Sequence, residues 1–137
     1  TKIEYRQVPY LWRFVVNALG IVIAAAAAFV ASAAYYGAAS ATPPSVPLPQ
    51  RPVGAVVLVE LLRSLAVAAL IGGLLAAGNW TGILEGALVG LSLWVLPVVL
   101  LAGSIFHEGV PMRRAALHTG DWLIKLVAIG AIVGLFS

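Results

Sequence analysis

Four charged side chains interrupt two stretches of this chain that are otherwise long and apolar. Glu60 and Arg63 are three positions apart, and Asp121 and Lys125 are four positions apart with the acid first. Both spacings place an acid and a base on the same face of a helix, where they can pair. An ion in the centre of a bilayer costs about 2.5–3.5 kcal/mol on insertion scales, so such residues are usually paired and often functional.

Helical geometry adds a histidine to this set. His118, Asp121 and Lys125 fall at positions i, i+3 and i+7, so they share one helix face. That face is expected to point into the protein, away from lipid. The arrangement that we predict is a neutral network in which Glu60 and Arg63 face Asp121 and Lys125, although Lys125 is long enough to extend toward the membrane surface.

Three interpretations of this charge cluster stay open. In the structural interpretation, it holds two helices in register and binds nothing. In the functional interpretation, it lines a pocket for a small anionic or zwitterionic headgroup or metabolite, with Arg63 as the anion-binding group and Trp94 and Trp122 as apolar walls. The third interpretation is passage of protons or ions through the same residues.

Further ionisable side chains gather at one predicted end of the protein, which we call side B, where the first and third spans end. They form the mouth of the cluster: His107, Glu108, Arg113 and Arg114. Histidine and carboxylates bind metals, but their spacing matches no standard zinc pattern, so we predict no metal site. No nucleophile elbow or phosphate-binding glycine loop occurs, so we assign no catalytic residue and no cofactor. Catalysis by an acid and a histidine at this mouth stays an alternative.

The composition shows why charges inside these stretches are exceptional. The 137 residues are 62% hydrophobic and 9% charged, whereas soluble domains carry about 25% charged residues. The surplus of apolar side chains predicts a multi-pass protein of the cell membrane. The net charge of +3 comes from scattered basic residues, which predicts contact with anionic lipid and no nucleic-acid binding. The absence of cysteine excludes disulfides and thiolate chemistry.

The predicted fold is an all-α membrane protein, a four-helix bundle with up-down-up-down topology in a single domain, residues 1–137. Helices are expected because backbone polar groups in lipid must be hydrogen-bonded within the chain. The predicted spans cover residues 14–36, 53–77, 82–106 and 115–136, and a Pro-rich loop covers residues 37–52. Each span is long enough to cross about 30 Å of hydrocarbon.

Local signals refine these boundaries. Residues 1–13 are predicted to lie along the membrane interface, because Pro9 interrupts a helix there and Tyr and Trp favour the headgroup zone. The first apolar run is longer than a signal-peptide core, so we interpret it as a true span. Pro97 is predicted to kink the third span. Glu85 lies in the first turn of that span, where an acid suits the helix dipole.

Glycines at helix-packing spacing mark the last two spans. Gly82, Gly86 and Gly90 are spaced by four in the third span, as are Gly130 and Gly134 in the fourth. This spacing lets two helix backbones approach closely. We expect these glycines to seal the bundle itself, and the alternative is a face for dimerisation. The predicted partners are therefore membrane lipid and either other membrane subunits or a second copy of the chain.

Several short stretches carry a family resemblance. They are Gly86–Gly90, Phe106–Gly109 with Pro111, and His118–Lys125 with Gly130. On these residues the chain resembles the bacterial membrane family catalogued as domain of unknown function 1761, with Tyr35-Tyr36 in the place of that family's Trp-Tyr pair. The resemblance implies a small four-helix membrane protein and brings no activity with it. It adds weight to five positions: Glu108, His118, Asp121, Trp122 and Lys125.

The function that the sequence favours is non-enzymatic. The chain is interpreted as an accessory module that binds a membrane partner, or as a bundle that associates with itself. One alternative is binding or transport of a small solute, ion or lipid through the charge cluster. Another is a membrane enzyme that uses His, Glu and Asp at the mouth.

Overall fold

The computed structural model describes residues 8–39 and 51–137, and the side chains from residue 15 onward. All regular secondary structure in these ranges is helical: α1 (Val8–Ala39), α2 (Val53–Gly78), α3 (Ile83–Leu93), α4 (Val95–Glu108) and α5 (Met112–Leu135). With α3 and α4 taken as one span, four helical segments are long and apolar enough to cross a membrane. The predicted all-α, four-span fold is confirmed. Residues 1–7 of the predicted interfacial segment and residues 40–50 of the predicted Pro-rich loop lie outside the described residues.

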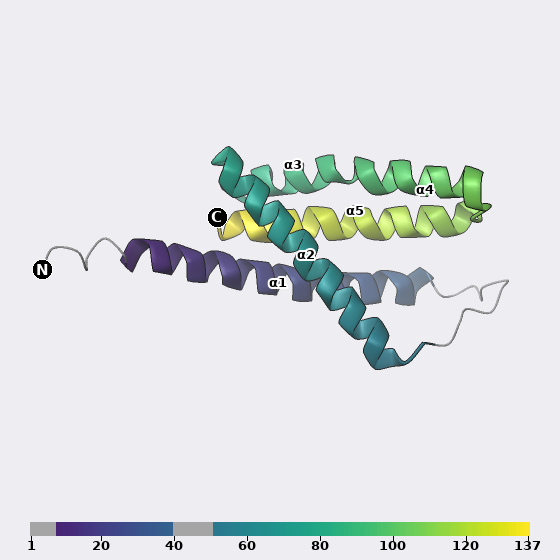
Figure 1. Cartoon of the computed structure of the whole chain (residues 1–137), viewed down its shortest axis with the longest axis horizontal. Coiled ribbons are helices and arrows are strands. Elements are labelled where there is room, and N and C mark those ends of the chain that lie inside the picture. The colour runs from purple at the N-terminus through teal and green to yellow at the C-terminus, as the bar shows by residue number, and fades with distance from the viewer. Residues whose placement is uncertain (1–7, 40–50) are drawn as a thin grey trace, which may run out of the picture.

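The spans alternate in direction, as Figure 1 shows. α5 lies between α1 and the α3–α4 span, and α2 crosses this layer diagonally. α5 contacts each of the other four helices, which makes it the centre of the bundle. The ends of α1 and α4 and the starts of α2 and α5 lie on side B, and the opposite face is called side A.

The two helix-interrupting prolines act differently. Pro9 is the second residue of α1, and a proline in the first helical turn removes no intrahelical hydrogen bond. The prediction that Pro9 interrupts the helix is therefore wrong. Pro97 does produce a break, because α3 ends at Leu93, the residue whose carbonyl would accept a hydrogen bond from position 97.

α3 and α5 pack backbone against backbone through glycines. A methyl group on Gly86 would overlap the carbonyl oxygen of Gly130, and one on Gly134 would overlap the carbonyl oxygen of Gly82. The Gly82 N–H also donates a hydrogen bond to the Gly134 carbonyl at 2.9 Å. Gly90 meets the backbone of Leu126 in the same way. These glycines lie inside the bundle, so their close packing serves the fold of a single chain.

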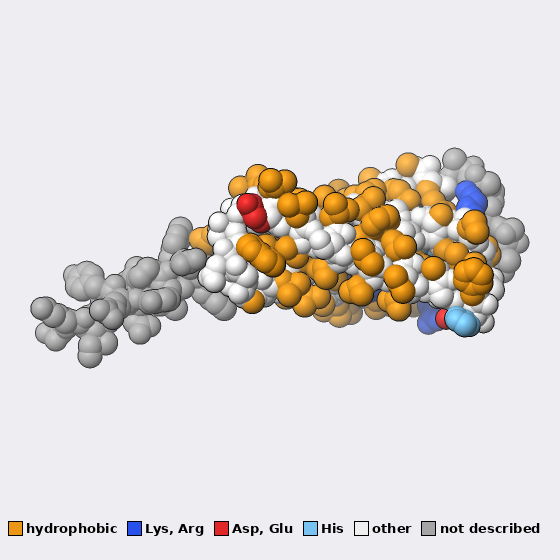
Figure 2. Space-filling view, turned by 90° about the horizontal axis from the view of Figure 1, so that it is seen from above, with side chains coloured by type: hydrophobic (Ala, Val, Ile, Leu, Met, Phe, Trp, Pro, Cys, Tyr) orange, Lys and Arg blue, Asp and Glu red, His pale blue; other side chains and the backbone are white. Residues whose placement is uncertain are grey.

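The apolar core occupies the side-A half of the bundle. Ile71, Leu75 and Ile129 are its largest fully buried side chains. Ala24 and Ala28 of α1 are also fully buried, and their small size lets α1 approach α2 and α5. The outer surface is also apolar: Figure 2 shows hydrophobic side chains over the middle of one face, with conspicuous charged side chains toward the ends. This distribution is that of a protein surrounded by lipid.

Candidate functional site

Side chains from three helices form one charged network. Lys125 of α5 makes ion pairs with Glu60 of α2 and, one turn away, with Asp121, whose Oδ2 is 2.9 Å from the lysine Nζ. Arg63 pairs with Glu60, with 3.3 Å between its guanidinium nitrogen and Oε2. Ser32 of α1 donates a hydrogen bond to Asp121 Oδ1 at 2.7 Å. The two acids and two bases sum to zero charge, and they connect α1, α2 and α5.

Burial differs sharply across this network. The side chains of Lys125 and Asp121 are only 3% and 6% exposed, whereas that of Arg63 is 49% exposed. Lys125 lies just beyond the middle of α5, so the buried end of the network is close to the midpoint of this span. The network therefore extends from a closed centre to a guanidinium at the outer surface of the bundle.

Two cation–π contacts join the cations of the network to one indole ring. The guanidinium carbon of Arg63 lies 5.0 Å from the centroid of the Trp122 ring, and Lys125 Nζ lies 5.6 Å from it. A cation over an indole face is attracted by the negative face of the ring. The Trp122 ring therefore lies next to both cations. Trp94, the other predicted wall, instead donates a hydrogen bond from Nε1 to the Thr119 carbonyl at 2.8 Å.

Because this bond ties the α3–α4 junction to α5, we expect Trp94→Phe to lower the free energy of unfolding by about 1 kcal/mol. The measurement is denaturant unfolding in detergent, followed by circular dichroism. Trp80→Phe is the matched control, since Trp80 is half exposed at the α2–α3 turn. Equal losses in the two variants would contradict the role of the Trp94 hydrogen bond.

The predicted mouth residues lie apart from the network. The side chains of His107, Glu108, Arg113 and Arg114 are exposed at side B, and no ion pair or hydrogen bond of the described residues joins them to Lys125 or Asp121. Glu108 accepts a 3.4 Å hydrogen bond from Ser104, one turn earlier in α4. The catalytic alternative at this mouth stays a hypothesis, based on the neighbouring His107 and Glu108.

His118 is held by a tyrosine for which the sequence predicts no part in the charge cluster. Its Nδ1 lies 2.6 Å from the Tyr36 hydroxyl of α1. Ser32 and Tyr36 were both missed, although they are polar residues four positions apart in a span without charges, so they share one face. That spacing is a signal that could have linked them to the acids and histidine of α5.

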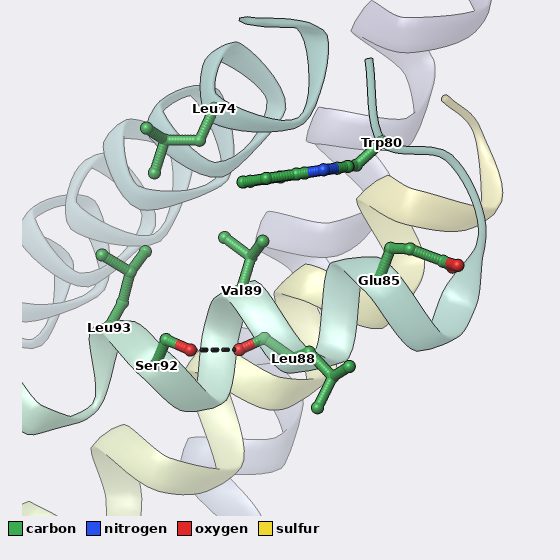
Figure 3. Close-up of a pocket in the computed structure, with 7 residues that line it drawn as sticks. All are labelled: Leu74, Trp80, Glu85, Leu88, Val89, Ser92 and Leu93. Carbon is green, nitrogen blue, oxygen red and sulfur yellow. Dashed lines mark hydrogen bonds between the residues drawn. The ribbon is translucent and has the colours of Figure 1, made fainter. Parts of the chain in front are cut away.

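Two neighbouring apolar pockets lie beside the network, between α2 and the α3–α4 span, and they are treated as two parts of one lateral surface. The side-A part has a volume of about 440 Å³ and is lined by Leu74, Trp80, Glu85, Leu88, Val89, Ser92 and Leu93. Figure 3 shows the Trp80 ring lying between Leu74 and Val89, with the Glu85 carboxylate directed away from them. The second part has about 320 Å³ and is lined by Val67, Leu70, Leu93, Leu96, Pro97, Leu100, Leu101, Trp122 and Leu126. Both parts share Leu93, and together we call them the lateral groove.

Arg63 lies at the edge of this groove. Arg63, Val67 and Leu70 are at positions i, i+4 and i+7 of α2 and therefore share one face. Val67, Leu70 and Trp122 line the groove, and Trp122 is the ring over which the guanidinium lies. The exposed end of the charged network and the lateral groove thus meet at Trp122.

Comparison with known proteins gives a match over most of the chain. The profile of a family described as "Protein of unknown function (DUF1761)" matches residues 19–134. This range includes the charged network and the lateral groove. No curated protein and no solved structure matches the chain.

Proposed function

Because this chain belongs to the DUF1761 family, whose function is unknown, its role has to be inferred from its own geometry, and we propose that it binds an anionic amphiphile in the lateral groove. The polar end of the ligand contacts Arg63, and its hydrocarbon chain lies along the groove. In this proposal the protein is a non-enzymatic binding module of the cell membrane.

The observation that carries the proposal is the position of the Arg63 guanidinium. It has five N–H donors in a planar fork, a geometry that suits the two oxygens of a carboxylate or phosphate. Its described ion pair with Glu60 is a single 3.3 Å contact, and half of the side chain is exposed. Because Trp122 fixes the guanidinium at the groove, an anionic group can reach it from the surrounding lipid.

The groove suits a flexible hydrocarbon chain. Volumes of about 300–1,000 Å³ with apolar walls and few polar groups are typical of small-molecule sites, and both parts of the groove fall within that range. Membrane helices dock on one another mainly through small residues, whereas leucine is the most frequent residue in these walls. The lining therefore favours an acyl or isoprenoid chain over a partner helix.

Association with membrane subunits or with a second copy is the alternative that the sequence favoured. The glycines that suggested it pack against each other inside the bundle, which removes one argument for a dimer through that face. The mass of the purified particle in detergent tests this alternative: a particle larger than a monomer would support it. If the protein also transports the amphiphile, its flux across liposome membranes should be measurable in addition to the binding proposed here.

The proposal predicts charge-selective stabilisation that depends on Arg63. At a free concentration of 100 times Kd, hexadecanoate should raise the free energy of unfolding by about 2.7 kcal/mol, and hexadecanol should raise it less. The Arg63→Gln variant should lose the difference between the two ligands. Thermal unfolding in detergent at pH 8 measures both effects.

Arg113→Gln provides the matched control, because Arg113 is exposed at side B and makes no described contact with the groove. It should keep the selectivity of the parent protein. Equal stabilisation by the acid and the alcohol in the parent protein, or unchanged selectivity in Arg63→Gln, would overturn the proposal.

A further inference from the structure

Polar groups form a ladder along the interface of α1 and α5, from side B to the middle of the bundle. The outermost rung is the pair Tyr36–His118, with 2.6 Å between the hydroxyl and Nδ1. The next is Ser32–Asp121, which lies one turn deeper on both helices. The innermost is Lys125, which pairs with Asp121 and with Glu60 of α2.

The ladder stops at the middle of the bundle. On α1, Tyr36 and Ser32 occupy two successive turns of this face on the side-B half. The next two turns toward side A carry Ala28 and Ala24, which are both fully buried. On α5 the positions beyond Lys125 are the buried Ile129 and Val133. Side A is therefore closed by apolar side chains, and side B is connected to the centre by polar ones.

A buried hydroxyl group lies near the inner end of the ladder. Ser64 follows Glu60 by one turn of α2, its residue is 3% exposed, and its Oγ has no hydrogen-bond partner among the described residues. Leaving such a group unsatisfied costs about 1–3 kcal/mol, and buried polar groups of this kind are commonly satisfied by internal water. This unsatisfied hydroxyl, independent of the ladder contacts, points to water entering this part of the bundle.

We propose that the ladder is a one-sided access route, through which protons and water reach Lys125 and its two carboxylate partners from side B and not from side A. The groups that face this route or act on it electrostatically come from three helices: Tyr35, Tyr36 and Ser32 of α1, Glu60 and Arg63 of α2, and Arg114, His118, Asp121 and Lys125 of α5. The proposal goes beyond amphiphile binding and does not depend on it.

The chemistry of the rungs identifies the proton as the species that passes. Hydroxyl and imidazole groups donate and accept hydrogen bonds, an ammonium group donates them and a carboxylate accepts them, so a proton can pass from one group to the next. The ammonium of Lys125 repels a metal cation at the inner end, and the described residues contain no group of three or more acidic, His or Cys ligands. A route built from these groups carries protons as far as Lys125, whereas a metal cation can enter its outer rungs from side B but is not held at its inner end.

The absence of cysteine from the chain makes access measurable. Four single variants sample one face of α1 at successive turns: Tyr36→Cys, Ser32→Cys, Ala28→Cys and Ala24→Cys. The probe is the silver ion, added to one side of vesicles that contain the purified protein, and the readout is the rate at which free thiol is lost. Glu108→Cys at side B and Ser137→Cys at side A are the reference variants, since each should react with silver that is added to its own side.

Tyr36→Cys and Ser32→Cys should react from side B only. Ala24→Cys should react about 100-fold more slowly from either side, because a thiol in dry apolar surroundings stays protonated and inert. Ser32→Cys reacting as slowly as Ala24→Cys, or reacting from side A, would overturn the proposal. Only variants that elute as the parent protein does enter the comparison.

A second measurement needs no folded cysteine variant. The infrared carboxylate bands of the parent protein, assigned by difference from Asp121→Asn, should shift when the pH falls on side B of uniformly oriented vesicles. They should stay constant when the pH falls on side A. A response to side A would reject the one-sided route even if every cysteine variant failed to fold.

Discussion

Lys125→Met should lower the free energy of unfolding by about 3–5 kcal/mol, the cost typical of removing one partner of a buried ion pair. Glu60 and Asp121 would both lose their shared cation. Asp121 is 6% exposed and would keep only the Ser32 hydrogen bond among its described contacts. Since Lys125 makes the described ion pair between Glu60 and α5, its loss should also weaken the packing of α2 against the bundle.

Unfolding in detergent with increasing denaturant, followed by circular dichroism, measures this effect. Arg113→Met is the matched control, since it removes an exposed base at side B and should change stability by less than about 0.5 kcal/mol. A loss of similar size in the two variants would show that Lys125 contributes nothing through its buried pairs.

A double variant separates charge imbalance from lost packing. Asp121→Asn combined with Lys125→Met removes one acid and one base, and Glu60 keeps its pair with Arg63. Because buried ion pairs can often be replaced by neutral residues at little cost, the double variant should be more stable than Lys125→Met alone. A double variant less stable than the single one would contradict the electrostatic explanation.

Gly86→Leu should lower the free energy of unfolding by as much as Lys125→Met does, for a steric reason. A first side-chain atom at Gly86 already overlaps the carbonyl oxygen of Gly130, so a leucine cannot be placed without separating α3 from α5. Changes that force a core apart are among the few that exceed about 4 kcal/mol. We expect the protein to lose its compact state in detergent, seen as early elution in size-exclusion chromatography and a lower melting temperature.

Gly73→Leu is the control on α2. No atom lies within 4 Å of a Cβ built there, and leucine has a better helix propensity than glycine by roughly 0.5–1 kcal/mol. This variant should therefore be as stable as the parent protein or slightly more stable. If Gly73→Leu and Gly86→Leu destabilise the protein equally, the contact between α3 and α5 is not what makes Gly86 necessary.

The fold could be predicted from the sequence because long apolar runs in lipid have few alternatives to helices. The pairing of charges followed from the same physics, and Glu60, Arg63, Asp121 and Lys125 do lie in contact in the structure. No prediction placed Ser32 or Tyr36 in the network, because a single hydroxyl group is tolerated in a membrane span and only the four-residue spacing of the two points to a shared face. Pro9 was misinterpreted because its effect depends on where α1 begins.

The lateral groove could not be predicted at all. It results from the diagonal path of α2 across the bundle (Figure 1), and no residue in α2 specifies a crossing direction. The half-exposed position of Arg63 has the same origin, since spacing alone places it next to Glu60 but does not say which side faces lipid. The depth of a charged residue in its span and its pairing within one helix follow from the local sequence, whereas grooves arise from the arrangement of whole helices.

The central position of α5 has a consequence for biosynthesis. Chains emerge from the ribosome N-terminal part first, so α5 is the last of the described helices to enter the membrane. Before α5 is inserted, Arg63 is the one described ionic partner that Glu60 can reach. The Ser32 hydroxyl at that stage lacks the Asp121 carboxylate to which it donates a hydrogen bond. The Glu60–Arg63 pair can therefore form within α2 while this helix is inserted. A chain whose translation stops before α5 lacks the helix that the other three spans contact, and such a chain should be a substrate for membrane proteases.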